Sequence, residues 1–100
     1  MDTIAYRDLT YTDTQGAKHI IKVVFAKPEE DRGAWMCKYE ISGAYEHAGV
    51  AYGGDSVQAL MLAMQAAGAH MNTPQLRGRV SMETLEGHGF PETAGSALAV

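Results

Sequence analysis

No Lys, Arg, Asp or Glu occurs between Ser56 and Met71, and this uncharged segment constrains the fold more than any other part of the sequence. It is rich in Ala, Leu, Met and Gln, which favour helix, and Pro74 lies just beyond it. Asp55 and Gln58 have the spacing of a capping box. In such a box the Asp55 carboxylate accepts from the free backbone N–H of Gln58, and the Gln58 side chain reaches back to the N-cap N–H. The pattern predicts one helix over this segment.

The predicted helix has two apolar sides. At about 100° per residue, its larger side chains share one sector, which we expect to face a sheet: Val57, Leu60, Met61, Met64, Gly68 and Met71. A second side, the small-residue flank, is formed by Ala59, Ala63, Ala66 and Ala67, of which Ala59, Ala63 and Ala66 are the candidate contact residues. A helix that is apolar nearly all round is covered on more than one side. The flank is therefore a candidate contact surface for the C-terminal segment or for a second subunit.

Alternation of apolar and polar residues between turn signals indicates strands in the first half of the chain. We expect four of them, at residues 4–11, 19–26, 35–42 and 45–52. The predicted fold class is α+β, with a four-stranded antiparallel meander packed on one face by the single helix at 56–71. Residues 76–82 are either a short fifth strand or an extended segment over the helix.

The longest polar stretch between predicted strands, residues 27–33, contains Pro28 and indicates an exposed loop. Three consecutive carboxylates lie in it, on Glu29, Glu30 and Asp31. Because they share one loop, they cannot flank a scissile bond from opposite sides as hydrolytic pairs do. They are either solvated or a charged patch for a basic protein partner.

Length and composition limit the class of protein. The 100 residues predict a single domain over 1–91, followed by a flexible tail of small residues at 92–100. Eight Lys and Arg against 12 Asp and Glu give a net charge of −4, which disfavours nucleic-acid binding. No apolar run reaches the ~20 residues of a membrane span, and the start does not resemble a signal peptide. With one cysteine, Cys37, we expect a protein of the cytoplasm.

The sequence contains few groups suited to chemistry. Its four histidines are His19, His47, His70 and His88. No two of them are spaced i, i+4 on a helix, so we predict no metal site. Cys37 alternates with Trp35 and Tyr39 on one strand face, where burial makes a thiol unreactive. We therefore predict no catalytic residue, no cofactor and no enzymatic activity.

Several short motifs resemble those of a family of small bacterial proteins of unknown function. They are a W-x-C strand at Trp35, a G-x-D-S-x-Q-A-L helix start that includes Gly54 to Leu60, and a late Gly89-Phe90-Pro91. The resemblance runs from about Lys22 to Pro91 and implies no catalytic residue. The strand-then-helix unit is more weakly similar to HicB-like antitoxin domains, and it lacks a recognisable DNA-binding segment after the helix. The resemblance implies an immunity-like or antitoxin-like partner protein.

Three hypotheses of different class follow. The first is a non-enzymatic protein-interaction module, an immunity- or antitoxin-like inhibitor that uses the acidic loop or a sheet edge against a basic toxin or nuclease. The second is a homodimeric structural or accessory protein joined through the small-residue flank. The third is a small-molecule-binding or enzymatic domain with a pocket between helix and sheet, at His47, Tyr52 or Cys37.

Overall fold

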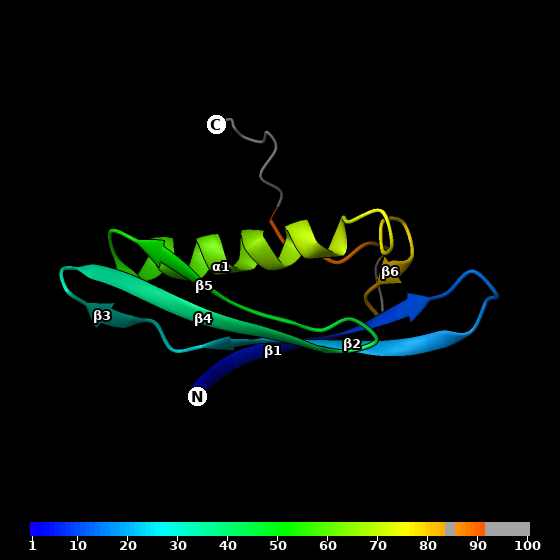
Figure 1. The fold of residues 1–100 in the computed structure, drawn as a ribbon, viewed down its shortest axis with the longest axis horizontal. Helices are drawn as coiled ribbons and strands as arrows, with labels where there is room; N and C mark the ends of the chain where they lie inside the picture. Colours follow the sequence, from blue (N-terminus) through cyan, green and yellow to red (C-terminus); the bar gives the residue numbers. More distant parts are fainter. Residues whose placement is uncertain (84–85, 92–100) are drawn as a thin grey trace.

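The computed structural model describes residues 1–83 and 86–91 and has two layers, a sheet and one helix lying across it (Figure 1). The predicted α+β class is confirmed. The elements are β1 (Thr3–Thr12), β2 (Lys18–Ala26), β3 (Glu29–Asp31), β4 (Ala34–Gly43), β5 (His47–Gly53), α1 (Ser56–Met71) and β6 (Val80–Ser81). Within the described ranges, no helix has the length and apolar character needed to cross a membrane. The tail predicted at 92–100 lies outside the described residues.

Four of the strands form the predicted meander, because β1, β2, β4 and β5 each pair antiparallel with the next. β6 adds to the free side of β1, where Thr10 pairs with Ser81 and Tyr11 with Val80. The strand alternative for residues 76–82 is thus the one observed, although it is only two residues long. Ser81 also forms a parallel bridge with Gly87, which brings the C-terminal segment to the same edge.

The prediction of an exposed loop over residues 27–33 is wrong in its centre, because Glu29–Asp31 forms strand β3. β4 is longer than its pairing with β2, which ends at the Phe25–Tyr39 pair, and β3 continues along the same edge to Met36 and beyond. Pro28, which lacks an N–H, lies in the gap between β2 and β3, where no ladder bond is required. A two-residue turn with both φ angles positive, at Arg32 (55°) and Gly33 (85°), then leads into β4.

The inner face of the sheet carries the core. Its fully or nearly buried side chains are Leu9, Ile21, Val23, Phe25, Cys37, Tyr39 and Ile41. α1 lies against β4 and β5, and the segment after it covers the remaining part of this face with Leu76, Val80 and Phe90 (Figure 1). The C-terminal third, which is poor in sequence signals, therefore completes the core.

The predicted orientation of the helix is confirmed at Gly68 and Met71, which are buried, and is wrong in the first half of the helix. Ala59, Ala63 and Ala67 have no exposed surface, whereas 64% of Val57 and 46% of Met61 is exposed. The cause is the small inner face of β5, which presents Gly49, Ala51 and Gly53 to the helix. A Cβ on Gly53 would lie 2.6 Å from the backbone nitrogen of Ala59, so helix and strand are in direct backbone contact. Only small residues fit between them.

Candidate functional site

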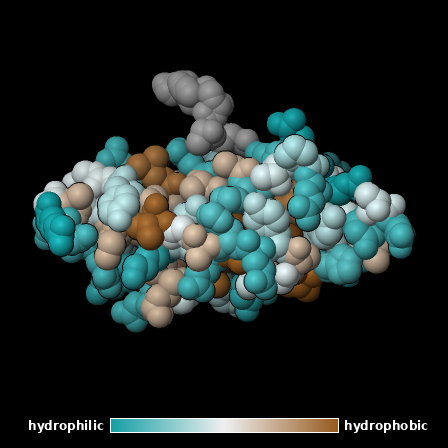
Figure 2. All heavy atoms as spheres, in the orientation of Figure 1, coloured by the Kyte–Doolittle hydropathy of each residue, from teal (hydrophilic) through white to brown (hydrophobic). Residues whose placement is uncertain are grey.

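The outer face of the sheet has no covering layer in the described part of the chain. Strand pairing places one set of alternate residues on this face, including the pairs Tyr6–Val24, Thr10–Ile20, Met36–Tyr52 and Lys38–Val50. The exposed large apolar side chains on these strands are Ile4, Tyr6, Ile20, Val50 and Tyr52. Figure 2 shows hydrophobic patches among hydrophilic ones on the sheet side of the molecule and over the N-terminal half of α1.

Charged side chains of both signs lie between the apolar ones. Lys22 approaches Asp8 at 3.9 Å and lies 4.9 Å from the centre of the Tyr6 ring. Lys38 and Glu40 occupy the corresponding positions on β4. An exposed face of this composition resembles the surface of a protein–protein contact, in which aromatic residues are enriched.

The predicted acidic patch lies on β3. Glu29, Glu30 and Asp31 are all exposed, and no ion pair involves them in the described part of the chain. β3 pairs only with β4, so it is an edge strand. Charges on an edge strand also prevent pairing with other chains, which accounts for their presence without any partner.

Most of the small-residue flank is not available as a contact surface. Ala59 and Ala63 are fully buried against the sheet, and Ala66 is half-buried beside the core. A second subunit cannot reach Ala59 and Ala63 while α1 stays in place. The interface predicted at these two residues is therefore corrected to an internal contact between helix and sheet, and at Ala66 it stays a prediction.

The cap residues have a local structural role. Asp55 is the N-cap of α1, and its Oδ1 accepts from the backbone N–H of Gln58 at 2.8 Å. The Gln58 side-chain oxygen accepts from the backbone N–H of Gly54 at 2.6 Å, one residue earlier than expected. The carboxylate thus occupies the position in which an anionic ligand would otherwise bind a helix N-terminus.

Two histidines meet at the boundary between β5 and α1. His47 is the first residue of β5, and His70 lies in the last turn of the helix. Their ring centroids are 3.9 Å apart with 35° between the planes. The Tyr45 hydroxyl is 2.8 Å from Nδ1 of His70, and Tyr39 lies nearby, with its ring centroid 5.9 Å from that of His47.

The surroundings of His70 shift its titration. Burial lowers the pKa of His70, and the nearby His47 lowers it further. Burial likewise raises the pKa of Tyr39, with a smaller contribution from Tyr45. His70 is therefore a neutral imidazole at pH 7, with a nitrogen lone pair that can accept a proton or bind a metal.

Sequence reasoning missed this pair, because the two histidines are 23 residues apart and belong to different elements. One signal was present in the helix. His70 follows Ala59, Ala63 and Ala66 at helical spacing, so it points the same way as the small-residue flank. Once that flank is placed against β4 and β5, His70 must also lie at β5.

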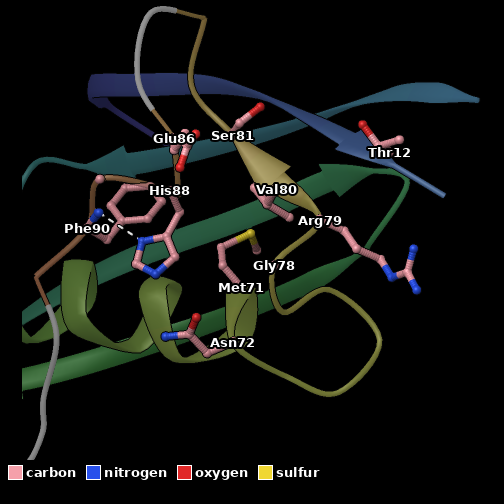
Figure 3. Close-up of a pocket in the computed structure, with 12 residues that line it drawn as sticks. Thr12, Met71, Asn72, Gly78, Arg79, Val80, Ser81, Glu86, His88 and Phe90 are labelled. Carbon is pink, nitrogen blue, oxygen red and sulfur yellow. Dashed lines mark hydrogen bonds between the residues drawn. The ribbon is translucent and has the colours of Figure 1, made fainter. Parts of the chain in front are cut away.

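A cavity of about 560 Å³ lies at the C-terminal end of α1 (Figure 3). Met71, Arg79, Val80, His88 and Phe90 are among the residues that line it, and the Arg79 guanidinium extends away from the other labelled side chains in Figure 3. Nδ1 of the buried His88 accepts from the backbone N–H of Phe90 at 2.9 Å, which holds the turn. The hydroxyls of Ser81 and Thr12 do not point toward the His88 ring in Figure 3.

The three residues predicted for a pocket between helix and sheet are not brought together. Cys37 is buried in the core, and its Sγ lies 3.4 Å from the carbonyl oxygen of Ala26. Tyr52 pairs with Met36 on the outer face, while His47 pairs with Ile41 on the inner face. Among the described residues, no group of three or more His, Cys, Asp or Glu side chains gathers in one place.

Cys37 provides a direct check of the buried face. Burial raises the pKa of its thiol, so the group is protonated at neutral pH and inaccessible to reagents. We expect iodoacetamide to label Cys37 fully in guanidinium chloride and far more slowly in the native protein, as measured by mass spectrometry. Equal labelling rates in the two states would contradict the placement of Cys37 in the core.

The geometry of the described residues defines a class: a two-layer α+β domain with one helix and a sheet open on its outer face. The chain belongs to the family described as Domain of unknown function (DUF6968), which it matches over residues 5–92. No curated protein and no solved structure matches it. The matched range includes the W-x-C strand, the capped helix start and the Gly89-Phe90-Pro91 segment.

Proposed function

We propose that this protein is a non-enzymatic protein-interaction module, an immunity- or antitoxin-like inhibitor that binds a basic protein through the outer face of its sheet. The observation that carries the proposal is the uncovered face itself, with exposed Tyr6, Ile20 and Tyr52. Leaving large apolar side chains in water gains nothing for folding, whereas burying them against a partner contributes about 25 cal/mol per Å². Aromatic residues also carry much of the energy of known interfaces.

Charge supports the choice of a basic partner. The acidic strand β3 lies at the end of the same sheet, and the chain carries a net charge of −4. Exposed carboxylates beside an apolar face speed association with a positive surface and make it dependent on salt. A toxin that binds nucleic acid, such as a nuclease, has such a surface.

Affinity capture with the natural partner tests this proposal. We expect the wild-type protein to retain one partner in stoichiometric amount and the Tyr6→Lys/Tyr52→Lys variant to lose it. Met61→Lys is the matched control, because Met61 is also exposed but lies on α1, away from the outer face. Reversing the charges of β3 should weaken binding about tenfold or more at low salt and less at high salt. Retention of the partner by the double tyrosine variant would contradict the proposal.

A homodimer is the second candidate for the same face. Asp8, Lys22, Lys38 and Glu40 mix both signs on one surface, which suits contact with a second copy related by a two-fold axis. Light scattering separates the two candidates. A monomer mass at high concentration excludes the homodimer, and a dimer mass that Tyr6→Lys/Tyr52→Lys abolishes supports it instead of the inhibitor.

A further inference from the structure

The histidine pair brings together two imidazoles from separate elements, β5 and α1. His47 is held by strand pairing, since it lies opposite Ile41 in the β4–β5 ladder. His70 is held by the last turn of α1 and by the 2.8 Å contact of its Nδ1 with Tyr45. His47 is exposed and His70 is half-buried, so the pair is accessible from solvent.

We propose that His47 and His70 form a two-imidazole binding site for a divalent transition metal of the zinc, nickel and copper class. Each metal–nitrogen bond in such a site is about 2.0–2.1 Å long, which places two neighbouring ligand nitrogens about 3 Å apart. The two rings now overlap face to face, with centroids 3.9 Å apart and 35° between their planes, so the exposed His47 ring has to rotate before its in-plane lone pair can meet that of His70 at one metal. Imidazole selects these metals over magnesium and calcium, which prefer oxygen ligands.

Tyr45 acts in this site as a positioning residue. A histidine that binds a metal through one nitrogen usually donates a hydrogen bond from the other, and this second contact fixes the tautomer and the ring orientation. The Tyr45 hydroxyl is placed to accept from Nδ1–H of His70. That arrangement leaves Nε2 of His70 as the nitrogen that carries the free lone pair for the metal.

The number of ligands sets the strength of the site. No third His, Cys, Asp or Glu joins the pair among the described residues, so water fills the other coordination positions. The site therefore differs from a closed structural zinc site, which has four protein ligands and contributes to folding outright. We expect micromolar affinity and a fold that does not require the metal. The net charge of −4 favours cation binding in general.

Isothermal titration of the untagged protein with zinc, nickel or copper salts tests the proposal. We expect one site per chain, with affinity lowered roughly tenfold or more by His47→Gln or His70→Gln. His19→Gln is the matched control. His19 is also exposed and also hydrogen-bonded, to Asp13 at 2.9 Å, but it lies on β2 away from the pair. Thermal melts of the metal-free variants identify any that fail to fold.

A measurement on the wild-type protein keeps the test independent of the variants. Paramagnetic copper should broaden amide signals around residues 47 and 70 before those around residue 19.

Tyr45→Phe should weaken binding about tenfold and shift the His70 imidazole nitrogen signals toward the other tautomer, which a purely structural role would not do. Absence of binding at millimolar metal, or broadening centred on His19 or His88, would overturn the proposal.

Discussion

Replacing Ala63 by leucine should lower the free energy of unfolding by about 3 kcal/mol, the upper end of what overpacking a core costs. Ala63 has no exposed surface and lies where α1 rests on β4 and β5. One helical turn earlier, at Ala59, helix and strand are so close that an ideal Cβ on Gly53 would fall 2.6 Å from the helix backbone. A longer side chain must therefore push α1 off the sheet. Urea unfolding followed by circular dichroism measures the loss.

The matched control is Met61→Leu on the opposite side of the same helix. Because Met61 is 46% exposed, we expect this change to stay within about 0.5 kcal/mol of the wild type. The pair of variants distinguishes the two possible rotations of α1. A large loss at Met61 and none at Ala63 would show that the larger side chains face the sheet, as the sequence alone suggests.

The ends of α1 were predictable and its rotation was not, for separate physical reasons. The ends depend on local chemistry, namely the Asp55 cap and the chain-breaking Pro74, and both can be read within a few residues. Rotation is normally marked by charged residues on the solvent side. α1 has none in its 16 residues, so side-chain size was the only guide. Side-chain size placed the larger residues of α1 toward the sheet. The inner face of β5 instead presents glycine and alanine, against which only small helix residues fit.

The strands illustrate the same limit. Four strands were predictable because apolar and polar residues alternate along each of them. β3 was not, because Glu29, Glu30 and Asp31 have low strand propensity and no alternation. They form a strand only because β4 extends beyond β2 and offers an unpaired edge, which is a property of the assembled sheet.

The candidate sites depend still more on assembly. Exposure of the outer face depends on how many layers the domain has, and the sequence does not specify that number. The contact of His47 with His70 follows from the rotation of α1, which the composition of the helix leaves open. The acidic residues and Cys37 were recognisable from sequence, because exposure of a charged run and burial of an alternating apolar face are local expectations.

Phe90→Ala should destabilise the protein by about 3–4 kcal/mol, as expected for a buried aromatic side chain that leaves a cavity. Phe90 meets Phe25 edge to face at 5.8 Å, and the Arg7 guanidinium lies 4.7 Å from its ring centre. The Cβ of Phe90 packs closely on Gly68 of α1, because a Cβ added at Gly68 would lie only 3.1 Å from it. The phenyl ring therefore joins the C-terminal segment to β1, β2 and α1 at once.

The loss should be accompanied by a local change, because residues 86–91 would lose their main apolar anchor. We expect faster hydrogen exchange at Val80 and Ser81 and in the part of β1 that pairs with them, measured against Ala48 and Val50 in β5 as unaffected references. Phe90→Leu should recover more than half of the lost stability, since it refills most of the cavity. If Phe90→Ala costs less than about 1 kcal/mol, the C-terminal segment is not part of the core. Gly89-Phe90-Pro91 would then require an explanation other than packing.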